Sequence, residues 1–201
     1  MALILLAVIV FGVIHSLLAG NVARAIFRRR FGERAYHGLY RLMFNAAAVI
    51  TSAPLLLLLV AVPGRELWRV EGPVALAMIG VQVVGSFGFL LSLLQIDIGR
   101  FLGLSQFDAY RRHDPLPLPP EPLQQTGVYQ LVRHPLYLFS LLVMWPMPLM
   151  TDTLLVFNIA ATAYLVIGSR LEEKRLLETF GQEYLEYRQR VPWLLPFARS
   201  G

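Results

Sequence analysis

The stretch PVALAMIGVQVVGSFGFLLSLLQI, residues 73–96, decides the class of fold, because it contains no charged side chain. A helix that crosses the roughly 30 Å hydrocarbon core of a membrane needs about 20 apolar residues. Backbone groups exposed to lipid must also be hydrogen-bonded within their own segment, as they are in a helix. We therefore predict that this stretch is a membrane-spanning helix.

Four other runs are also nearly free of charge: residues 1–19, 42–62, 136–150 and 153–169. Together with 73–96 they predict five membrane spans. The last two runs are short and are separated by prolines, so we predict a tight helical hairpin that compensates by tilt or by its flanking residues. The 201 residues are 56% hydrophobic and only 15% charged, which is atypical of a soluble domain. The predicted fold class is all-α, a polytopic membrane helical bundle of about five transmembrane helices.

The first run has no basic n-region, and NVARAIFRRR follows Gly20 in place of a small-residue cleavage site. We therefore expect a retained span rather than a signal peptide. The chain contains no cysteine, so disulfides, a thiolate metal site and a cysteine nucleophile are excluded. No metal site is predicted.

Positive charge is concentrated between the first two spans, where a single acid, Glu33, accompanies six arginines: Arg24, Arg28, Arg29, Arg30, Arg34 and Arg41. By the positive-inside rule this segment is a cytoplasmic loop, the N-terminus is outside, and the 97–135 loop and the C-terminal tail are cytoplasmic. The net charge of +5 is thus a signal of topology and of contact with anionic membrane lipids. We expect a multi-pass protein of a bacterial-type inner membrane and no nucleic-acid partner.

Residues 97–126 connect a three-span part, 1–96, to a C-terminal part, 127–197, within a single membrane domain. The connector contains RRHDPLPLPPEPLQQTG, whose prolines exclude a regular helix and predict an extended cytoplasmic segment. The third span contains four small residues: Gly80, Gly85, Gly88 and Ser92. Small residues let a neighbouring helix approach closely. That helix can belong to the same chain or to a second copy, so the oligomeric state stays open.

An apolar stripe at helical spacing follows the last span: Leu177, Phe180, Tyr184, Tyr187 and Val191. It predicts an amphipathic juxtamembrane helix that ends before Pro192, with Trp193 as an interfacial anchor. Gly181 carries a helix penalty, so we expect a break there.

The stretch GVYQLVRHPLYLF, residues 127–139, begins the fourth span with an arginine, a histidine and a proline. Proline suits the first position of a helix, which places His134 at the N-cap. The free N–H groups of Leu136 and Tyr137 and the positive end of the helix dipole then predict an anion site on the cytoplasmic side. The alternative is an ordinary helix start, with Arg133 as a snorkelling interface residue.

Glu172 and Glu173 lie at the cytoplasmic end of the fifth span. In a hairpin these carboxylates face the start of the fourth span across a gap lined by Tyr129, Tyr137 and Tyr184. The alternative is a solvated helix face. A site of this kind fits a ligand with both a carboxylate and a cation, such as S-adenosylmethionine, whose sulfonium is stabilised by carboxylates and aromatic faces.

The pattern GVYxxxRHPxY, followed about 35 residues later by EExxLxxxFGxxYxxYxxxVPxxxP, resembles the isoprenylcysteine carboxyl methyltransferase and phospholipid methyltransferase superfamily over roughly residues 121–197. FGVIHSLLAG and YRLMFNAAAVI are similar to a bacterial branch with methanethiol S-methyltransferases and NnrU-like proteins. The resemblance implies that S-adenosylmethionine binds between the last two spans and the C-terminal helix and that the acceptor arrives through the membrane. It implies cofactor contacts at these residues, the first two as looser matches: Leu123, Gln124, Tyr129, His134, Pro135, Leu136, Tyr137 and Glu172. Arg133 and Glu173, which stand beside them in the same motifs, complete our candidate cofactor-binding residues.

The chain departs from the family pattern at several positions. Glu121 stands in place of a histidine, so Leu123 and Gln124 match loosely, and Phe139 replaces a frequent glycine and is expected to reshape the pocket wall. Gly168 stands where the prenylcysteine branch has an arginine that holds the substrate carboxylate. Arg170 lies about 200° away around a helix, which favours a thiol or amine acceptor over a carboxylate.

A thiol acceptor reacts as its thiolate, so a nearby cation or histidine base assists transfer. His15 in the first span, and Arg41 with Asn45 at the start of the second, are polar groups at membrane depth or its edge and are our candidate catalytic residues. The alternative is that His15 and Asn45 pair with each other or with a backbone carbonyl in helix packing. Gln106 is a candidate for the route of the acceptor.

We therefore predict a membrane methyltransferase that uses S-adenosylmethionine and acts on a small or lipophilic acceptor, with a thiol favoured. Alternatives within the superfamily are a prenylcysteine carboxyl and a phospholipid amine methyltransferase. A haem-binding or electron-transfer protein of NnrU type would need a second axial ligand beside His15. A membrane reductase and a non-catalytic scaffold or transporter subunit are the remaining alternatives.

Overall fold

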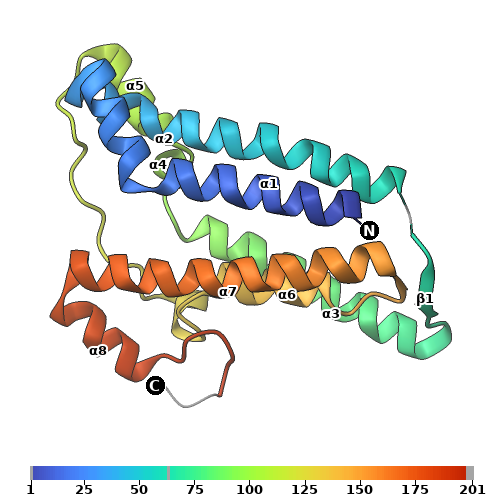
Figure 1. The fold of residues 1–201 in the computed structure, drawn as a ribbon. Coiled ribbons are helices and arrows are strands. Elements are labelled where there is room, and N and C mark those ends of the chain that lie inside the picture. The colour runs from blue at the N-terminus through green and yellow to red at the C-terminus, as the bar shows by residue number, and fades with distance from the viewer. Residues whose placement is uncertain (1, 63, 198–201) are drawn as a thin grey trace. The chain divides into compact units, whose positions relative to one another are not determined.

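The computed structural model describes residues 2–62 and 64–197. Figure 1 shows that helices make up most of this part of the chain. The helices are α1 (Ala2–Ala19), α2 (Asn21–Ala61), α3 (Gly72–Leu94), α4 (Ile98–Leu102), α5 (Leu104–Arg112), η1 (Gly127–Gln130, a 3₁₀ helix), α6 (Pro135–Met144), α7 (Asp152–Phe180) and α8 (Gln182–Arg190). The strands are β1 (Glu66–Arg69) and β2 (Leu149–Thr151).

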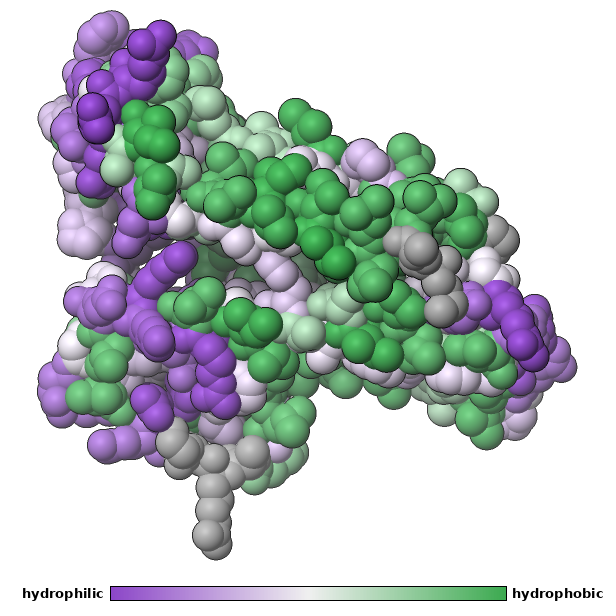
Figure 2. Space-filling view, viewed as in Figure 1, coloured by the Kyte–Doolittle hydropathy of each residue, from purple (hydrophilic) through white to green (hydrophobic). Residues whose placement is uncertain are grey.

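The predicted helical membrane fold is confirmed. Within the described ranges, α2, α3 and α7 are long and apolar enough to cross a membrane, and α1 and α6 are shorter apolar helices. Figure 2 shows hydrophobic side chains exposed over much of the visible surface. Large hydrophobic residues of α2, α3 and α7 are exposed, among them Ile50, Leu57, Leu76, Val83 and Ile167. Apolar exposure on this scale is typical of a lipid-facing surface. The count of five spans stays a prediction.

The chain divides into two compact units: Met1–Pro63 with Asp97–Glu121, and Gly64–Ile96 with Pro122–Gly201. Helix α3 therefore belongs to the second unit, together with α6, α7 and α8. We predicted from its position in the chain that this helix groups with the first two spans. Position in the chain carries no information on which helices pack together.

In the first unit, α1 packs along α2, and the phenol of Tyr40 donates a hydrogen bond to the carbonyl of Leu18. The arginine-rich segment that we predicted to be a loop is the first part of α2, so that prediction was wrong. Arginine has a high helix propensity, and a run of it does not end a helix. The helix changes direction at Gly32, whose positive φ of 84° favours glycine.

The connector is partly helical, because α4 and α5 occupy its first half. Helix α5 packs on α2, where Gly38 lies against the ring of Tyr110 and Arg34 donates to the carbonyls of Tyr110 and Asp114. The proline-rich remainder, residues 113–126, contains neither helix nor strand, as predicted.

In the second unit, α6 packs closely along α3. A Cβ added at Gly85 would lie 3.0 Å from the Cβ of Leu142, and one added at Gly88 would clash with the ring of Phe139. The predicted close approach at these glycines is thus confirmed within one chain, whereas a Cβ at Gly80 meets nothing within 4 Å.

The ring of Phe139 is buried in the interface between α3 and α6, where it lies against Gly88. An effect of Phe139 on the pocket wall stays a prediction. Two residues along a helix are about 200° apart around the axis, so Phe139 and Tyr137 point to different sides of α6.

A short antiparallel pairing of β1 with β2 joins the segment before α3 to the turn between α6 and α7. The indole of Trp68 donates to the carbonyl of Met147, and Asp152 accepts from the backbone N–H of Arg65. The sequence did not predict this pairing, because strands of four and three residues are too short to show periodicity.

Helix α7 continues past the apolar run to Phe180 and ends at Gly181, whose φ is 52°. Helix α8 then ends before Pro192, so both the predicted break and the predicted end are confirmed. Tyr184, Tyr187 and Val191 are buried and pack against Leu176 rather than the exposed Leu177. The predicted apolar stripe was therefore wrong at Leu177, because the break at Gly181 changes the phase of the helical pattern.

Candidate active site

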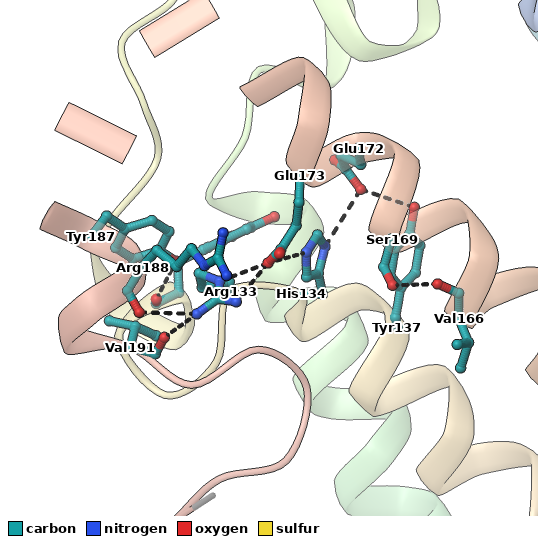
Figure 3. Close-up of polar contacts among 11 residues, drawn as sticks. Arg133, His134, Tyr137, Val166, Ser169, Glu172, Glu173, Tyr187, Arg188 and Val191 are labelled. Atoms are coloured by element: carbon teal, nitrogen blue, oxygen red, sulfur yellow. Dashed lines mark hydrogen bonds and ion pairs between the residues drawn. The ribbon is translucent and has the colours of Figure 1, made fainter. Parts of the chain in front are cut away.

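The polar cluster of the second unit begins at the start of α6 (Figure 3). Pro135 is the first helical residue, and the carbonyl of His134 accepts hydrogen bonds from the backbone N–H groups of Tyr137 and Leu138 at 3.1 and 3.0 Å. The N–H of Tyr137 is therefore not free, and this part of the predicted anion site was wrong. The cause is a tight first turn, in which i→i+3 bonds satisfy donors that a regular helix leaves unpaired.

Arg133 is buried rather than snorkelling, so this part of the alternative reading was wrong. Its Nε and Nη2 lie 2.8 and 2.7 Å from Oε1 of Glu173. Its Nη1 donates to the carbonyls of Val191 and Arg188 at 2.6 and 3.1 Å. The side chains of Arg133 and Glu173 are only 2% and 9% exposed, so the ion pair is shielded from water.

The imidazole of His134 lies between two carboxylates (Figure 3). Its Nδ1 is 3.5 Å from Oε2 of Glu172, and its Nε2 is 3.4 Å from Oε1 of Glu173. Burial by itself would lower the pKa of His134, but the hydrogen bonds and charges of Glu172 and Glu173 outweigh burial and raise the pKa above its ordinary value. The cluster therefore favours the imidazolium form.

Glu172 differs from its neighbour because 48% of its side chain is exposed. Its Oε2 accepts a hydrogen bond from the phenol of Tyr137 at 3.0 Å, and the ring of Tyr137 stacks on that of His134. One carboxylate is thus held in place by two side chains of α6 and its N-cap while it remains accessible to a ligand.

Tyr129 belongs to the same cluster. Burial and the negative charge of Glu172 raise its pKa to about 12, so the phenol is neutral at physiological pH. Its hydroxyl donates to the carbonyl of Ser92 at 3.4 Å, and its own carbonyl accepts from the phenol of Tyr187 at 2.6 Å. These bonds fix η1 between α3 and α8.

The remaining predicted cofactor residues lie nearby in the chain and have structural partners. Leu123 packs on the cluster of Tyr184, Tyr187 and Val191, and the amide of Gln124 donates to Thr126 at 3.3 Å. Pro135 is buried, and Leu136 is half-buried. The second unit therefore contains all ten predicted cofactor residues, and their contact with a cofactor stays a prediction.

The three candidate catalytic residues belong to the first unit. His15 packs against the rings of Phe11 and Phe44, with centroids 5.5 and 4.5 Å away. Arg41 Nε and Asn45 Nδ2 both donate to the carbonyl of Phe101, at 3.1 and 3.0 Å. Asn45 thus has the backbone-carbonyl partner that the packing alternative supposed, and a catalytic role for these residues stays a prediction.

Gln106 also has a structural partner, because its amide donates to the carbonyl of Arg100 at 3.2 Å. Helix α5, rather than a loop, carries this residue.

The sequence missed the C-terminal turn as part of the site. The backbone N–H groups of Arg133 and His134 donate to the carbonyls of Pro192 and Trp193 at 2.9 and 3.3 Å. The signal available was Val191-Pro192, which ends α8 and leaves its last carbonyls without helical donors. No local pattern indicates that Arg133 supplies those donors.

The structure also locates the two positions that bear on the acceptor. A Cβ at Gly168 would lie 4.0 Å from the phenol oxygen of Tyr137, so position 168 faces the hydroxyl that donates to Glu172. The guanidinium of Arg170 lies over the ring of Trp193, 3.7 Å from its centroid. Arg170 is thus directed to the C-terminal turn and does not replace a side chain at 168.

The sequence profile of the phospholipid methyltransferase family matches residues 75–183. The chain is 33% identical to methanethiol S-methyltransferase 2 of Bradyrhizobium diazoefficiens over 202 residues, 97% of this chain and 73% of the relative. Identity to methanethiol S-methyltransferase of Pseudomonas sp. (strain GM41(2012)) is 33%, over 95% of this chain and 74% of the relative. The chain is also 40% identical to protein-S-isoprenylcysteine O-methyltransferase B of Arabidopsis thaliana over 78 residues, 35% of this chain and 38% of the relative. No solved structure matches the chain.

Proposed function

The chain belongs to the phospholipid methyltransferase family, and on that premise we propose that it transfers the methyl group of S-adenosylmethionine to a small or lipophilic thiol. The observation that carries the proposal is the accessible carboxylate of Glu172, held by Tyr137 and His134 at the start of α6. Family membership favours this function over the haem-binding, reductase and scaffold alternatives.

The charges and aromatic rings of the cluster fit the methyl donor. A sulfonium and an ammonium are both attracted to a carboxylate and to aromatic faces, and Glu172, Tyr137 and Tyr129 supply these groups. When bound, S-adenosylmethionine supplies a methyl group on a positively charged sulfur. Glu172 would bind the cationic part of the donor, while Tyr137 and His134 hold the carboxylate in one orientation. Alignment of this kind supplies much of the reduction in barrier for an in-line displacement.

The choice of a thiol as the acceptor rests on two residues of α7, Gly168 and Arg170. Gly168 presents no cation toward Tyr137, and Arg170 is stacked on Trp193. A substrate carboxylate therefore finds no guanidinium at this position, whereas a thiol needs none. In this proposal His15, Arg41 and Asn45 act on the acceptor, with His15 as the base and Arg41 as the cation that favours a thiolate.

Transfer of a labelled methyl group from S-adenosylmethionine to a panel of acceptors tests the proposal. We expect methanethiol and longer alkyl thiols to be methylated at least about tenfold faster than amines, phospholipids or a prenylcysteine analogue, a difference of roughly 1.4 kcal/mol in barrier. Gly168→Arg is expected to lower thiol methylation because its side chain fills the space beside Tyr137. Gly168→Ala is the matched control, since its Cβ makes only ordinary contact.

His15→Gln in the same assay is expected to lower thiol methylation without weakening donor binding. Methyl-ester formation on the prenylcysteine analogue as fast as thiol methylation would contradict the acceptor assignment. Unchanged thiol methylation in His15→Gln would remove the proposed base.

We further propose that the N-terminus is outside a bacterial-type inner membrane and that the cluster and the C-terminal tail are cytoplasmic. The excess of arginine at the start of α2 supports this orientation. Because the chain has no cysteine, single cysteines introduced at Glu71 and Glu178 report without background. In intact cells an impermeant maleimide is expected to label position 71 and not 178, and the opposite pattern would contradict the orientation.

A further inference from the structure

We propose that Arg133 and Glu173 are positioning residues, which join the C-terminal turn to the start of α6 and thereby hold His134 against Glu172. The proposal rests on the proposed function, because it takes Glu172 as the carboxylate that binds the methyl donor. It assigns different roles to two adjacent glutamates that the sequence treated alike.

The two glutamates differ in exposure and in partners. Side chains of adjacent helical residues point about 100° apart, and here Glu173 is 9% exposed whereas Glu172 is 48% exposed. The charge of Glu173 is balanced by two nitrogens of Arg133 within 2.8 Å. Such a buried pair leaves Glu173 little capacity to bind a ligand, whereas Glu172 remains accessible.

Arg133 links the start of α6 to α7 and α8. Its guanidinium contacts Glu173 on α7 and the carbonyls of Arg188 and Val191 at the end of α8. The last carbonyls of a helix have no donor within the helix, and an arginine can serve them and a carboxylate at once because its planar fork carries five N–H donors. A lysine ammonium is a single point with three donors, so it cannot span the same set.

The main chain reinforces this connection. The N–H groups of Arg133 and His134 donate to the carbonyls of Pro192 and Trp193. Residues 133 and 134 are thus held by side-chain and backbone bonds to the same turn. The position of His134, one residue before α6, therefore depends on the C-terminal turn as well as on Pro135.

The imidazole depends on Glu173 directly. Among the residues that the structure describes, Glu172 and Glu173 from α7 and Tyr137 from α6 are the titratable groups that face His134, and Arg133 is adjacent in the chain. Loss of the charge of Glu173 would remove one of two carboxylates that stabilise the imidazolium, so the pKa of His134 would fall. If Glu173 only supported the fold, its substitution would not shift the pH at which binding of the methyl donor changes.

The test compares Glu173→Gln, Glu173→Asp and Arg133→Lys with Glu178→Gln, an exposed glutamate of the same helix. Calorimetry measures the affinity for S-adenosylmethionine between pH 5.5 and 8.5, and labelled transfer gives KM for donor and for thiol separately. We expect Glu173→Gln and Arg133→Lys to raise the donor KM about tenfold with the thiol KM unchanged, and Glu173→Gln to move the midpoint of the pH dependence to lower pH. Glu173→Asp should restore the midpoint in part, and Glu178→Gln should match the wild type.

The outcomes separate this proposal from the proposed function. If wild-type protein fails to bind the donor, the proposed function fails. If the wild type binds and Glu172→Gln does not, but Glu173→Gln keeps both the donor KM and the pH midpoint, only the positioning role is overturned. A loss of activity in Glu173→Gln that merely follows the folded fraction, with an unchanged midpoint, overturns it as well. If Arg133→Lys does not fold, the two variants at position 173 decide the question.

Discussion

Glu172→Gln is expected to reduce methyl transfer strongly while the protein stays folded. The substitution keeps the shape of the side chain and an oxygen that can accept from Tyr137, but it removes the negative charge. A hydrogen bond to a charged group contributes about 1.5–3 kcal/mol, which corresponds to roughly 10- to 150-fold in affinity. Labelled methyl transfer at limiting donor concentration measures the loss.

Stability should change little in this variant, because the side chain of Glu172 is 48% exposed and does not take part in the buried ion pair. The midpoint of thermal unfolding in detergent is therefore expected to stay close to that of the wild type. Glu178→Gln is the matched control and should retain full transfer. Full transfer in Glu172→Gln would remove Glu172 from the site.

Gly88→Ala is expected to lower stability substantially, because the added Cβ would clash with the buried ring of Phe139. Overpacking of this kind costs about 1–3 kcal/mol. For a protein of this size, 1 kcal/mol lowers the unfolding midpoint by roughly 2–4 °C. Thermal unfolding of the purified protein in detergent measures the shift.

Two matched variants test whether the contact between position 88 and Phe139 causes the loss of stability. Gly80→Ala should be close to neutral, because its Cβ meets nothing within 4 Å. Phe139→Leu in the Gly88→Ala background should recover part of the loss, since the smaller side chain makes room for the methyl group, and a double-mutant cycle isolates this coupling. Equal midpoints for Gly88→Ala and Gly80→Ala would contradict the close packing of α6 on α3.

The sequence predicts those features that a local pattern encodes. Runs without charge locate the apolar helices, the glycines at 85 and 88 indicate a close helix contact, and Gly181 and Pro192 mark where helices end. The cluster around His134 was also found, because RHP and the paired glutamates are local signals. Their proximity followed from the assumption of a hairpin.

Other features depend on pairings between distant residues and could not be predicted in this way. Arg133 bonds to carbonyls 55 and 58 residues away, and β1 pairs with a strand about 80 residues later. The different exposure of Glu172 and Glu173 depends on which side of α7 is covered by α6 and α8. The sequence contains no signal for this difference, because the two residues are identical and adjacent.

The most direct test of the central claim is a calorimetric titration of S-adenosylmethionine into purified wild-type protein and Glu172→Gln under the same conditions. We expect saturable binding to the wild type and binding weakened by at least about tenfold in the variant, or roughly 1.4 kcal/mol. Equal binding to both proteins, or no binding to folded wild-type protein, would contradict the claim that Glu172 and its partners form the site of the methyl donor.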